Sequence, residues 1–263
     1  MTCANVKFYF MFIIRLILLL LLAETAYADG IVTDNIRITS TALGYDLQYR
    51  VYLPQDYHPG TTYPVLYLTD GQHYLKSGRV PRILDRLINN GKINPVIAVF
   101  VDSRDPDNLK TNRRNAQFNC NVDYLRFFAY ELIPTVEMNY PVIKNRNGRT
   151  IMGFSFGATN AACFGLMGYE IFSGIAMQSP ANHAVPKLLP TYQARPRLPL
   201  KIFLSTGVPN DNTQANRKFH NVLKNKDYDM KYIEFRQGHN WENWRPLIGD
   251  ILIYFYRAAI QGN

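Results

Sequence analysis

The chain has 263 residues, of which 47% are hydrophobic, so it is long enough to bury a full core. Its formal net charge is +9, yet the basic residues are scattered and no basic stripe with interleaved aromatic residues occurs, which argues against a nucleic-acid-binding protein. A positive balance of this kind is consistent with an anionic small-molecule partner, with an acidic cell-envelope surface, or simply with solubility. Neither a Cys-x-x-Cys nor a His-x-x-x-His spacing is present, so we expect no bound metal.

The N-terminus predicts a secretory leader. Lys7 and Arg15 accompany a leucine-rich run that ends at Ala23, and Ala26-Tyr27-Ala28 fits the small-x-small rule for signal peptidase. We therefore expect a signal peptide over residues 1–28, cleavage after Ala28, and an exported single domain over residues 29–263 with no stable membrane insertion. The alternative is an uncleaved N-terminal anchor, because the apolar stretch nearly reaches membrane-spanning length.

The following segments predict an α/β fold. Residues 31–40 and 45–53 alternate polar and apolar side chains, as in an antiparallel pair at a sheet edge. Short, nearly continuous apolar runs are typical of strands buried on both faces of a parallel sheet, and they lie at 64–68, 95–101, 150–152, 174–177 and 200–204, with a further strand at 231–235. Predicted helices separate the strands at 79–90, 122–138, 156–168, 213–226 and 241–259. This alternation predicts a three-layer sandwich, mostly parallel, with an antiparallel N-terminal edge.

Two polar segments interrupt this pattern. Residues 102–121 and the proline-rich residues 182–199 are expected to be loops, either over the mouth of a pocket or as ordinary surface connections.

The motif Gly153-Phe154-Ser155-Phe156-Gly157 points to a nucleophile. In such an elbow the chain turns sharply from strand to helix, the serine backbone is strained, and the glycines leave room for the crowding. The five letters alone should arise by chance in roughly one chain in ten of this length. A buried strand before the motif and a helix after it give the context that predicts Ser155 as nucleophile.

A nucleophilic serine needs a base, and His239 is the best candidate. It follows the strand at 231–235 and precedes the final helix, so it should emerge at the same sheet edge as Ser155. His220 lies within a helix, where a solvated or packing role is expected, and His183 lies in a loop that could touch substrate or simply face solvent.

Asp211 is the predicted orienting carboxylate, because it follows the strand at 200–204 on the same edge. Asp227 and Asp229 precede the strand that delivers His239 and should lie at the opposite rim, and Asp250 lies within the last helix. The alternative for Asp211 is an N-cap of helix 213–226, although Asn212 could fill that position instead.

Acyl transfer also requires donors for the developing oxyanion. The backbone N–H of Phe156 comes with the elbow, and the Gln72 N–H is the second candidate, although Asp70-Gly71 could be a simple turn. Candidate substrate contacts are His73, Trp241 and Trp244, but packing of the final helix explains the two tryptophans equally well.

Three cysteines are present, and Cys3 would leave with the leader. In an exported protein Cys120 and Cys163 could form a disulfide. Because Cys163 lies in the helix behind Ser155, two unpaired buried thiols are an equally reasonable expectation.

The motifs taken together resemble the putative esterase family of α/β-hydrolases. The resemblance spans roughly Ile31 to Ile260 and is carried by three segments: Val65-Leu66-Tyr67-Leu68-Thr69-Asp70-Gly71-Gln72, Gly153-Phe154-Ser155-Phe156-Gly157 and Gly238-His239-Asn240-Trp241-Glu242-Asn243-Trp244-Arg245. The family includes enterochelin esterases, feruloyl esterases, S-formylglutathione hydrolases and antigen 85 mycolyltransferases. The resemblance places the nucleophile on Ser155, the base on His239 and the oxyanion amides on Gln72 and Phe156. The family acid falls near Asp211, in a loop that is a residue longer here.

The predicted function is therefore that of a cofactor-independent serine esterase acting through an acyl-enzyme. The resemblance implies a siderophore ester or a carbohydrate-linked aromatic ester as substrate, and the positive charge suits an anionic one. The alternatives are an acyltransferase that uses the same acyl-enzyme and a non-catalytic ligand-binding homologue.

Overall fold

The computed structural model describes residues 29–259. The predicted signal peptide over residues 1–28 lies outside these residues. Within residues 29–259, none of the helices combines the length and the apolar character that crossing a bilayer requires.

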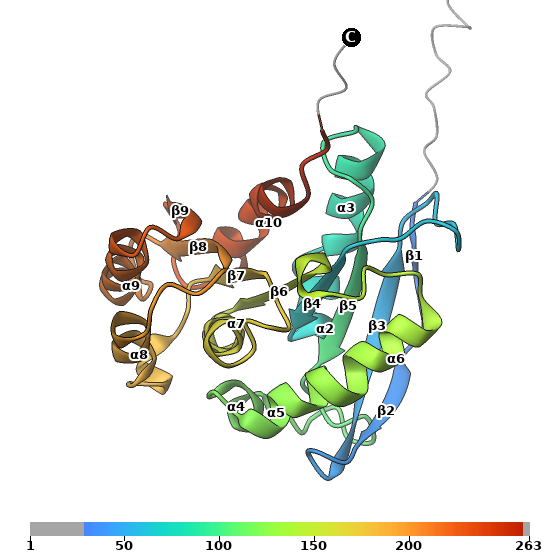
Figure 1. Ribbon diagram of the computed structural model, residues 1–263, viewed down its shortest axis with the longest axis horizontal. Helices are drawn as coiled ribbons and strands as arrows, with labels where there is room; N and C mark the ends of the chain where they lie inside the picture. Colours follow the sequence, from blue (N-terminus) through green and yellow to red (C-terminus); the bar gives the residue numbers. More distant parts are fainter. Residues whose placement is uncertain (1–28, 260–263) are drawn as a thin grey trace, which may run out of the picture.

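A single nine-stranded sheet forms the centre of the molecule (Figure 1). Its strands are β1 (Ile31–Val32), β2 (Ile36–Ser40), β3 (Tyr45–Leu53), β4 (Val65–Thr69), β5 (Ile97–Asp102), β6 (Arg149–Phe154), β7 (Gly174–Gln178), β8 (Lys201–Gly207) and β9 (Asp229–Phe235). The spatial order is β1-β3-β5-β4-β6-β7-β8-β9, and β2 pairs with the other half of β3. The pairs from β5 to β9 are parallel, whereas β1, β2 and β5 run antiparallel to β3. The predicted α/β sheet with an antiparallel N-terminal edge is thus confirmed.

Helices cover both faces of the sheet, which explains the continuous apolar strands. On one face lie α2 (Gly71–Lys76), α3 (Val80–Asn89) and α10 (Trp241–Tyr256); on the other lie α4 (Arg114–Phe118), α5 (Val122–Phe127), α6 (Ile133–Asn139), α7 (Phe156–Met167), α8 (Leu188–Ala194) and α9 (Thr213–Asn225) (Figure 1). Strand side chains alternate between the two cores: Tyr67 packs with α5 and α7, whereas its neighbours Leu66 and Leu68 pack with α2, α3 and α10. All five residues of β4 are buried for this reason.

The structure differs from the sequence expectation in several short elements. Segments expected to be loops contain the short helices α2, α4 and α8, and the strand expected over residues 31–40 is divided into β1 and β2. The helix expected at 122–138 consists of α5, a π-helical turn at Phe128–Leu132 and α6. Helices of five to seven residues contain too few positions to show a 3.6-residue period, so sequence periodicity misses them.

The parallel arrangement brings several loops to one rim of the sheet. The residues that follow the carboxyl ends of β4, β6, β7, β8 and β9 all lie there, because parallel strands end on the same side. This rim carries the candidate site.

Candidate active site

The turn between β6 and α7 has the strained geometry of a nucleophile elbow. The backbone of Ser155 adopts φ 55° and ψ −121°, a conformation that residues other than glycine rarely adopt. A Cβ on Gly153 would lie 2.2 Å from the carbonyl carbon and oxygen of Gly157, so only glycine fits at that position. The Ser155 N–H donates to the Gln178 carbonyl at 2.9 Å and thereby holds the turn against β7. The predicted strain and the predicted need for glycine are both confirmed.

Three side chains from separate loops form one chain of hydrogen bonds. The Nε2 atom of His239 lies 2.8 Å from Ser155 Oγ, and its Nδ1 atom lies 2.6 Å from Asp211 Oδ1. The carboxylate is fully buried, whereas the imidazole is 32% exposed. With Nδ1–H donated to the carboxylate, Nε2 is left to accept the serine proton.

The surroundings of Asp211 keep its carboxylate ionised. Burial alone would raise its pKa, but hydrogen bonds from His239, Ser179 and the backbone N–H groups of Gly207 and Asn212 lower the pKa to about 2. The alternative role as a helix cap does not apply, because the N-cap residue of α9 is Asn212.

A second set of groups, which the sequence reasoning missed, supports Asp211. Ser179 follows β7 at the same rim with φ 51°, donates its hydroxyl to Asp211, and accepts hydrogen bonds from Trp244 Nε1 at 2.9 Å and Asn243 Nδ2 at 3.2 Å. Asn243 Nδ2 also lies 3.2 Å from Asp211 Oδ2. Ser179 could have been identified from its position after the carboxyl end of β7, because residues that follow parallel strands meet at one rim, and this rule also pointed to His239.

Trp244 is a correction to the expected substrate contacts. Its ring is only 5% exposed and packs edge-on against the His239 imidazole, with ring centres 5.0 Å apart. Because its N–H is used by Ser179 and its faces are covered, Trp244 supports the histidine from behind.

The two predicted oxyanion donors are free to bind a ligand. Phe156 is the first residue of α7 and Gln72 the second of α2, and helical residues this early lack an intrahelical acceptor for their N–H. Neither N–H donates a hydrogen bond to any group in residues 29–259. Asp70-Gly71 is more than a simple turn, because it begins α2, and a Cβ on Gly71 would lie 2.4 Å from the Phe100 carbonyl carbon in β5.

Arg114 is a further charged group at the site that the sequence reasoning missed. Its Nη2 and Nε atoms lie 2.8 and 3.0 Å from Oδ2 of the fully buried Asp70, whose Oδ1 accepts the Ser103 hydroxyl at 2.8 Å. The guanidinium carbon lies 5.3 and 5.6 Å from the ring centres of Phe156 and Phe154, the neighbours of Ser155. The one available signal was Arg113-Arg114, a tight basic pair in a long polar segment.

The remaining candidate residues surround this centre. His73 and Trp241 are half-buried, and their ring centres lie 5.9 and 4.8 Å from the ring centre of Phe154. His183 lies 6.1 Å from the Phe156 ring, whereas His220 stacks on Tyr232 at 4.1 Å, away from the serine. No group of three or more His, Cys, Asp or Glu side chains that could hold a metal occurs in residues 29–259.

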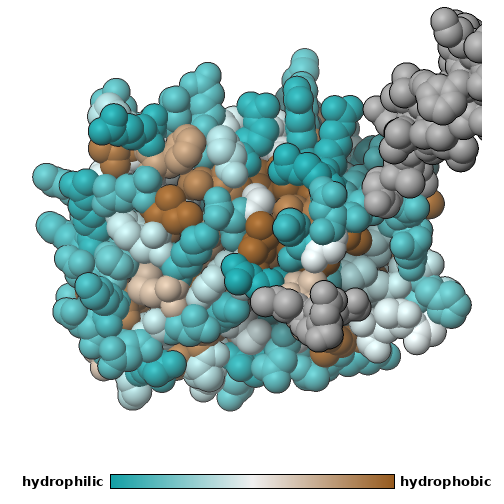
Figure 2. Space-filling model, turned by 90° about the horizontal axis from the view of Figure 1, so that it is seen from above, coloured by the Kyte–Doolittle hydropathy of each residue, from teal (hydrophilic) through white to brown (hydrophobic). Residues whose placement is uncertain are grey.

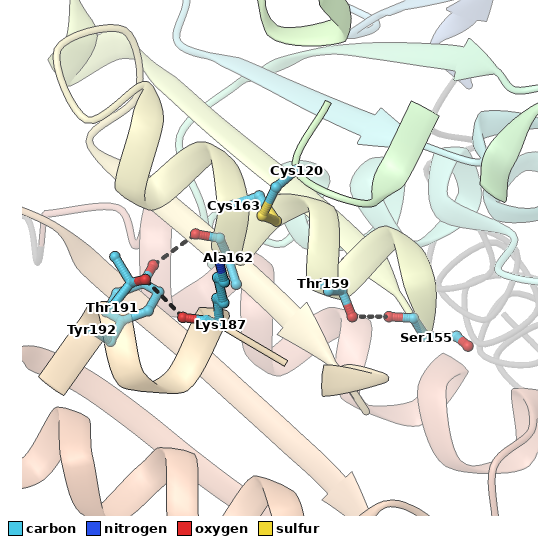
Figure 3. Close-up of a disulfide and its surroundings, with 8 residues drawn as sticks. All are labelled: Cys120, Ser155, Thr159, Ala162, Cys163, Lys187, Thr191 and Tyr192. Atoms are coloured by element: carbon cyan, nitrogen blue, oxygen red, sulfur yellow. Dashed lines mark hydrogen bonds between the residues drawn. A yellow bond between two sulfur atoms is a disulfide. The ribbon is translucent and has the colours of Figure 1, made fainter. Parts of the chain in front are cut away.

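Cys120 and Cys163 form a disulfide (Figure 3). The bridge links the segment after α4 to α7, the helix that begins directly after Ser155. Of the two expectations left open by the sequence, the structure therefore has the bridge, and it links the Arg114 segment to the helix that follows Ser155.

Comparison with known proteins supplies the family. The family model described as putative esterase matches residues 40–255. The uncharacterized protein YjcH of Bacillus subtilis (strain 168) is 30% identical over 232 residues, which cover 84% of this chain and 95% of that protein. An esterase of Mycobacterium tuberculosis (strain ATCC 25618 / H37Rv) is 30% identical over 155 residues, or 56% of this chain, and the match spans 32% of its own length.

Solved structures show the same fold. A ferulic acid esterase superposes with a TM-score of 0.76 at 20% identity, covering 88% of this chain and 98% of that one. The enterobactin esterase of Shigella flexneri, solved in the presence of enterobactin, gives a TM-score of 0.75 at 22% identity, covering 84% of this chain and 58% of that one. The chain belongs to the putative esterase family of α/β-hydrolases, whose named members support ester hydrolysis as its activity.

Proposed function

We propose that the protein is a serine esterase in which Ser155, His239 and Asp211 form the catalytic triad. The observation that carries the proposal is the unbroken hydrogen-bond chain from Ser155 Oγ through His239 to Asp211. Two unpartnered amides at Phe156 and Gln72 accompany it.

In the first step Ser155 Oγ attacks the ester carbonyl while His239 Nε2 takes its proton. The N–H groups of Phe156 and Gln72 stabilise the charge that develops on the carbonyl oxygen. The imidazolium then protonates the leaving alkoxide, and an acyl-enzyme remains. In the second step His239 Nε2 takes a proton from water, which attacks the acyl carbon. The imidazolium then returns this proton to Ser155 Oγ as the bond to the acyl carbon breaks, and the acid leaves.

Asp211 holds the imidazole in the tautomer that this mechanism requires. Its lowered pKa of about 2 keeps the carboxylate charged at neutral pH, so it can stabilise the imidazolium. The hydrogen bonds from Ser179 and Asn243 fix the carboxylate and therefore the ring.

For the substrate we propose an ester that carries an aromatic and anionic acyl or alcohol group. Phe154, His73 and Trp241 supply an aromatic cluster beside the serine, and the Arg114 guanidinium adds positive charge. The Arg114 Nη1 atom makes no hydrogen bond to residues 29–259 and is available to a ligand oxygen. Iron(III) complexes of catechol esters combine these properties, and the solved structures of similar fold are named a ferulic acid esterase and an enterobactin esterase.

We also propose that the chain is exported after cleavage behind Ala28 and acts as a single domain over residues 29–263. The Cys120–Cys163 disulfide supports this, because structural disulfides persist mainly in oxidising compartments. N-terminal sequencing of the protein recovered from a cell-envelope fraction tests it, with Asp29 as the expected first residue.

Hydrolysis of p-nitrophenyl acetate tests the mechanism. Ser155→Ala should lower kcat/KM by at least about 10³-fold and abolish labelling by a fluorophosphonate probe. Ser173→Ala, at the opposite end of β7, is the matched control and should change neither. Undiminished hydrolysis by Ser155→Ala would exclude Ser155 as the nucleophile.

The substrate proposal needs its own comparison. The anionic iron(III) complex of a tricatechol trilactone, and the uncharged methyl ferulate and methyl cinnamate, should be compared as substrates of the wild type and of Arg114→Gln. We expect Arg114→Gln to raise KM for the anionic catechol ester and to leave KM for methyl cinnamate nearly unchanged. Product analysis with added glycerol would show a new ester if the acyl-enzyme were passed to an alcohol.

A further inference from the structure

A cleft that shares no residue with the Ser155 centre lies between α3 and α10. It has a volume of about 530 Å³, within the usual range for small-molecule sites, and is lined by Arg79, Arg82, Ile83, Arg86, Arg245, Pro246 and Gly249. Figure 2 views the molecule from the side of α3 and α10, where the surface is largely hydrophilic with hydrophobic side chains between. The cleft thus combines four guanidinium groups with a small apolar surface.

The helical register explains why the arginines converge. Arg82 and Arg86 are four residues apart on α3 and share one face, Arg79 directly precedes that helix, and Arg245 reaches the cleft from α10. Like charges at this spacing repel one another, so the arrangement disfavours the ligand-free fold.

No carboxylate of residues 29–259 neutralises these four arginines through an ion pair. The acid of α3, Asp85, is turned to another side, where it accepts hydrogen bonds from the Gly30 N–H at 2.9 Å and the Tyr52 hydroxyl at 2.7 Å. The positive charge of the cleft is therefore left for a ligand.

Gly249 keeps the cleft open. It lies inside α10, where glycine disfavours the helix relative to alanine, and its φ is not in the left-handed region. A Cβ at this position would meet no atom within 4 Å, so packing does not require glycine here. The missing side chain leaves space in the cleft.

From these observations we infer that the α3–α10 cleft is a binding site for a small, free polyanion with two or more phosphate groups. Guanidinium groups bind phosphate oxygens in pairs, and four of them match a pyrophosphate better than a single phosphate. The site shares no residue with the Ser155 centre, so the inference does not depend on the proposed esterase activity.

Isothermal titration of inorganic pyrophosphate into protein purified from the full-length gene tests the inference. We expect one site per chain, the same affinity in Ser155→Ala, and at least tenfold weaker binding in the double variant Arg82→Gln/Arg86→Gln. The matched control is Arg126→Gln on α5, which removes an exposed arginine like Arg82 and Arg86, but from the opposite layer, and should change affinity less than twofold.

Gly249→Leu tests the same site without removing charge. The leucine should project into the cleft and weaken pyrophosphate binding at least tenfold, while the thermal midpoint stays equal to or above that of the wild type, because leucine favours the helix. If no pyrophosphate binding were detected at 1 mM, on the order of the weakest affinity we expect for four guanidinium groups, the proposed site would be refuted. Equal loss of pyrophosphate affinity in Arg126→Gln and in the double variant would also refute it. A separate titration with phosphatidylglycerol vesicles tests a membrane surface as the ligand, and binding to these vesicles but not to pyrophosphate would refute the inference as well.

Discussion

Replacing Asp211 by asparagine tests the central geometry most directly. The carboxylate accepts on both oxygens: Oδ1 from His239 and the Asn212 N–H, and Oδ2 from Ser179, the Gly207 N–H and Asn243. An asparagine amide must turn its NH2 group toward one of these sets of donors. Either orientation therefore leaves a buried N–H facing another donor.

The expected loss of activity follows from the tautomer of His239. If the NH2 group faces Nδ1, the ring accepts there and carries its proton on Nε2, so it no longer takes the proton of Ser155. We expect kcat/KM to fall by about 10³- to 10⁴-fold, or about 4 to 5.5 kcal/mol of transition-state stabilisation.

The expected loss of stability follows from the pKa and the unsatisfied donors. The difference between the ordinary value of 3.8 and about 2 in the folded protein corresponds to about 2 kcal/mol at neutral pH. An unpaired buried donor adds about 1–3 kcal/mol, so Asp211→Asn should lower the free energy of unfolding by about 3–5 kcal/mol. Because the folded pKa is lowered, the ionised carboxylate stabilises the fold above pH 4, and this contribution is lost as the pH falls toward 2.

Urea unfolding from pH 7 down to pH 2.5 and p-nitrophenyl acetate hydrolysis at pH 7 measure the two effects. The stability difference between wild type and variant should shrink below pH 4. Asp250→Asn is the control, because Asp250 is 46% exposed and pairs with Lys231 at 2.8 Å, so it should cost less than about 1 kcal/mol and leave hydrolysis unchanged. If Asp211→Asn kept more than a tenth of kcat/KM, the role given to Asp211 would be wrong.

Three further predictions concern the groups around the elbow. Reduction of the Cys120–Cys163 bridge, which spans 43 residues, should lower the free energy of unfolding by up to about 4 kcal/mol in denaturant titrations, with hydrolysis largely retained, because neither cysteine contacts the triad. Unchanged stability after verified reduction would contradict this. Arg114→Gln should cost about 3 kcal/mol because it leaves the buried Asp70 carboxylate without its cationic partner, and adding Asp70→Asn should restore much of it; a strictly additive double variant would argue against the pairing. Gly153→Ala should cost about 3 kcal/mol or more in urea unfolding, since its Cβ would overlap the backbone of α7, and wild-type stability would refute that overlap.

Much of the fold was predictable because its strands and longer helices carry strong patterns. Runs such as Val65–Leu68 are continuous because both faces of the sheet are covered, and the order of strand and helix then leaves a parallel sheet as the expected solution. Short helices such as α2 and α4 were not predictable, since contacts with β5 and α7 rather than periodicity stabilise them.

The residues of the candidate site also fall into those that could be predicted from the sequence and those that could not. The elbow motif pointed to Ser155, and the rule that loops after parallel strands meet at one rim then pointed to His239 and Asp211. That rule gives a location but no distances, and it does not reach residues that approach the site from outside the sheet. Arg114 on α4 and Trp244 on α10 belong to this second group.

The sequence by itself determined the fold class, the elbow and the order of the three side chains, because each depends on local pattern and chain direction. Only the tertiary structure decided which way each side chain turns. Trp244 faces inward against His239, Cys120 meets Cys163, and four arginines converge between α3 and α10. These outcomes depend on packing between elements far apart in the chain, and packing is set by the three-dimensional shape of both partners rather than by either segment alone.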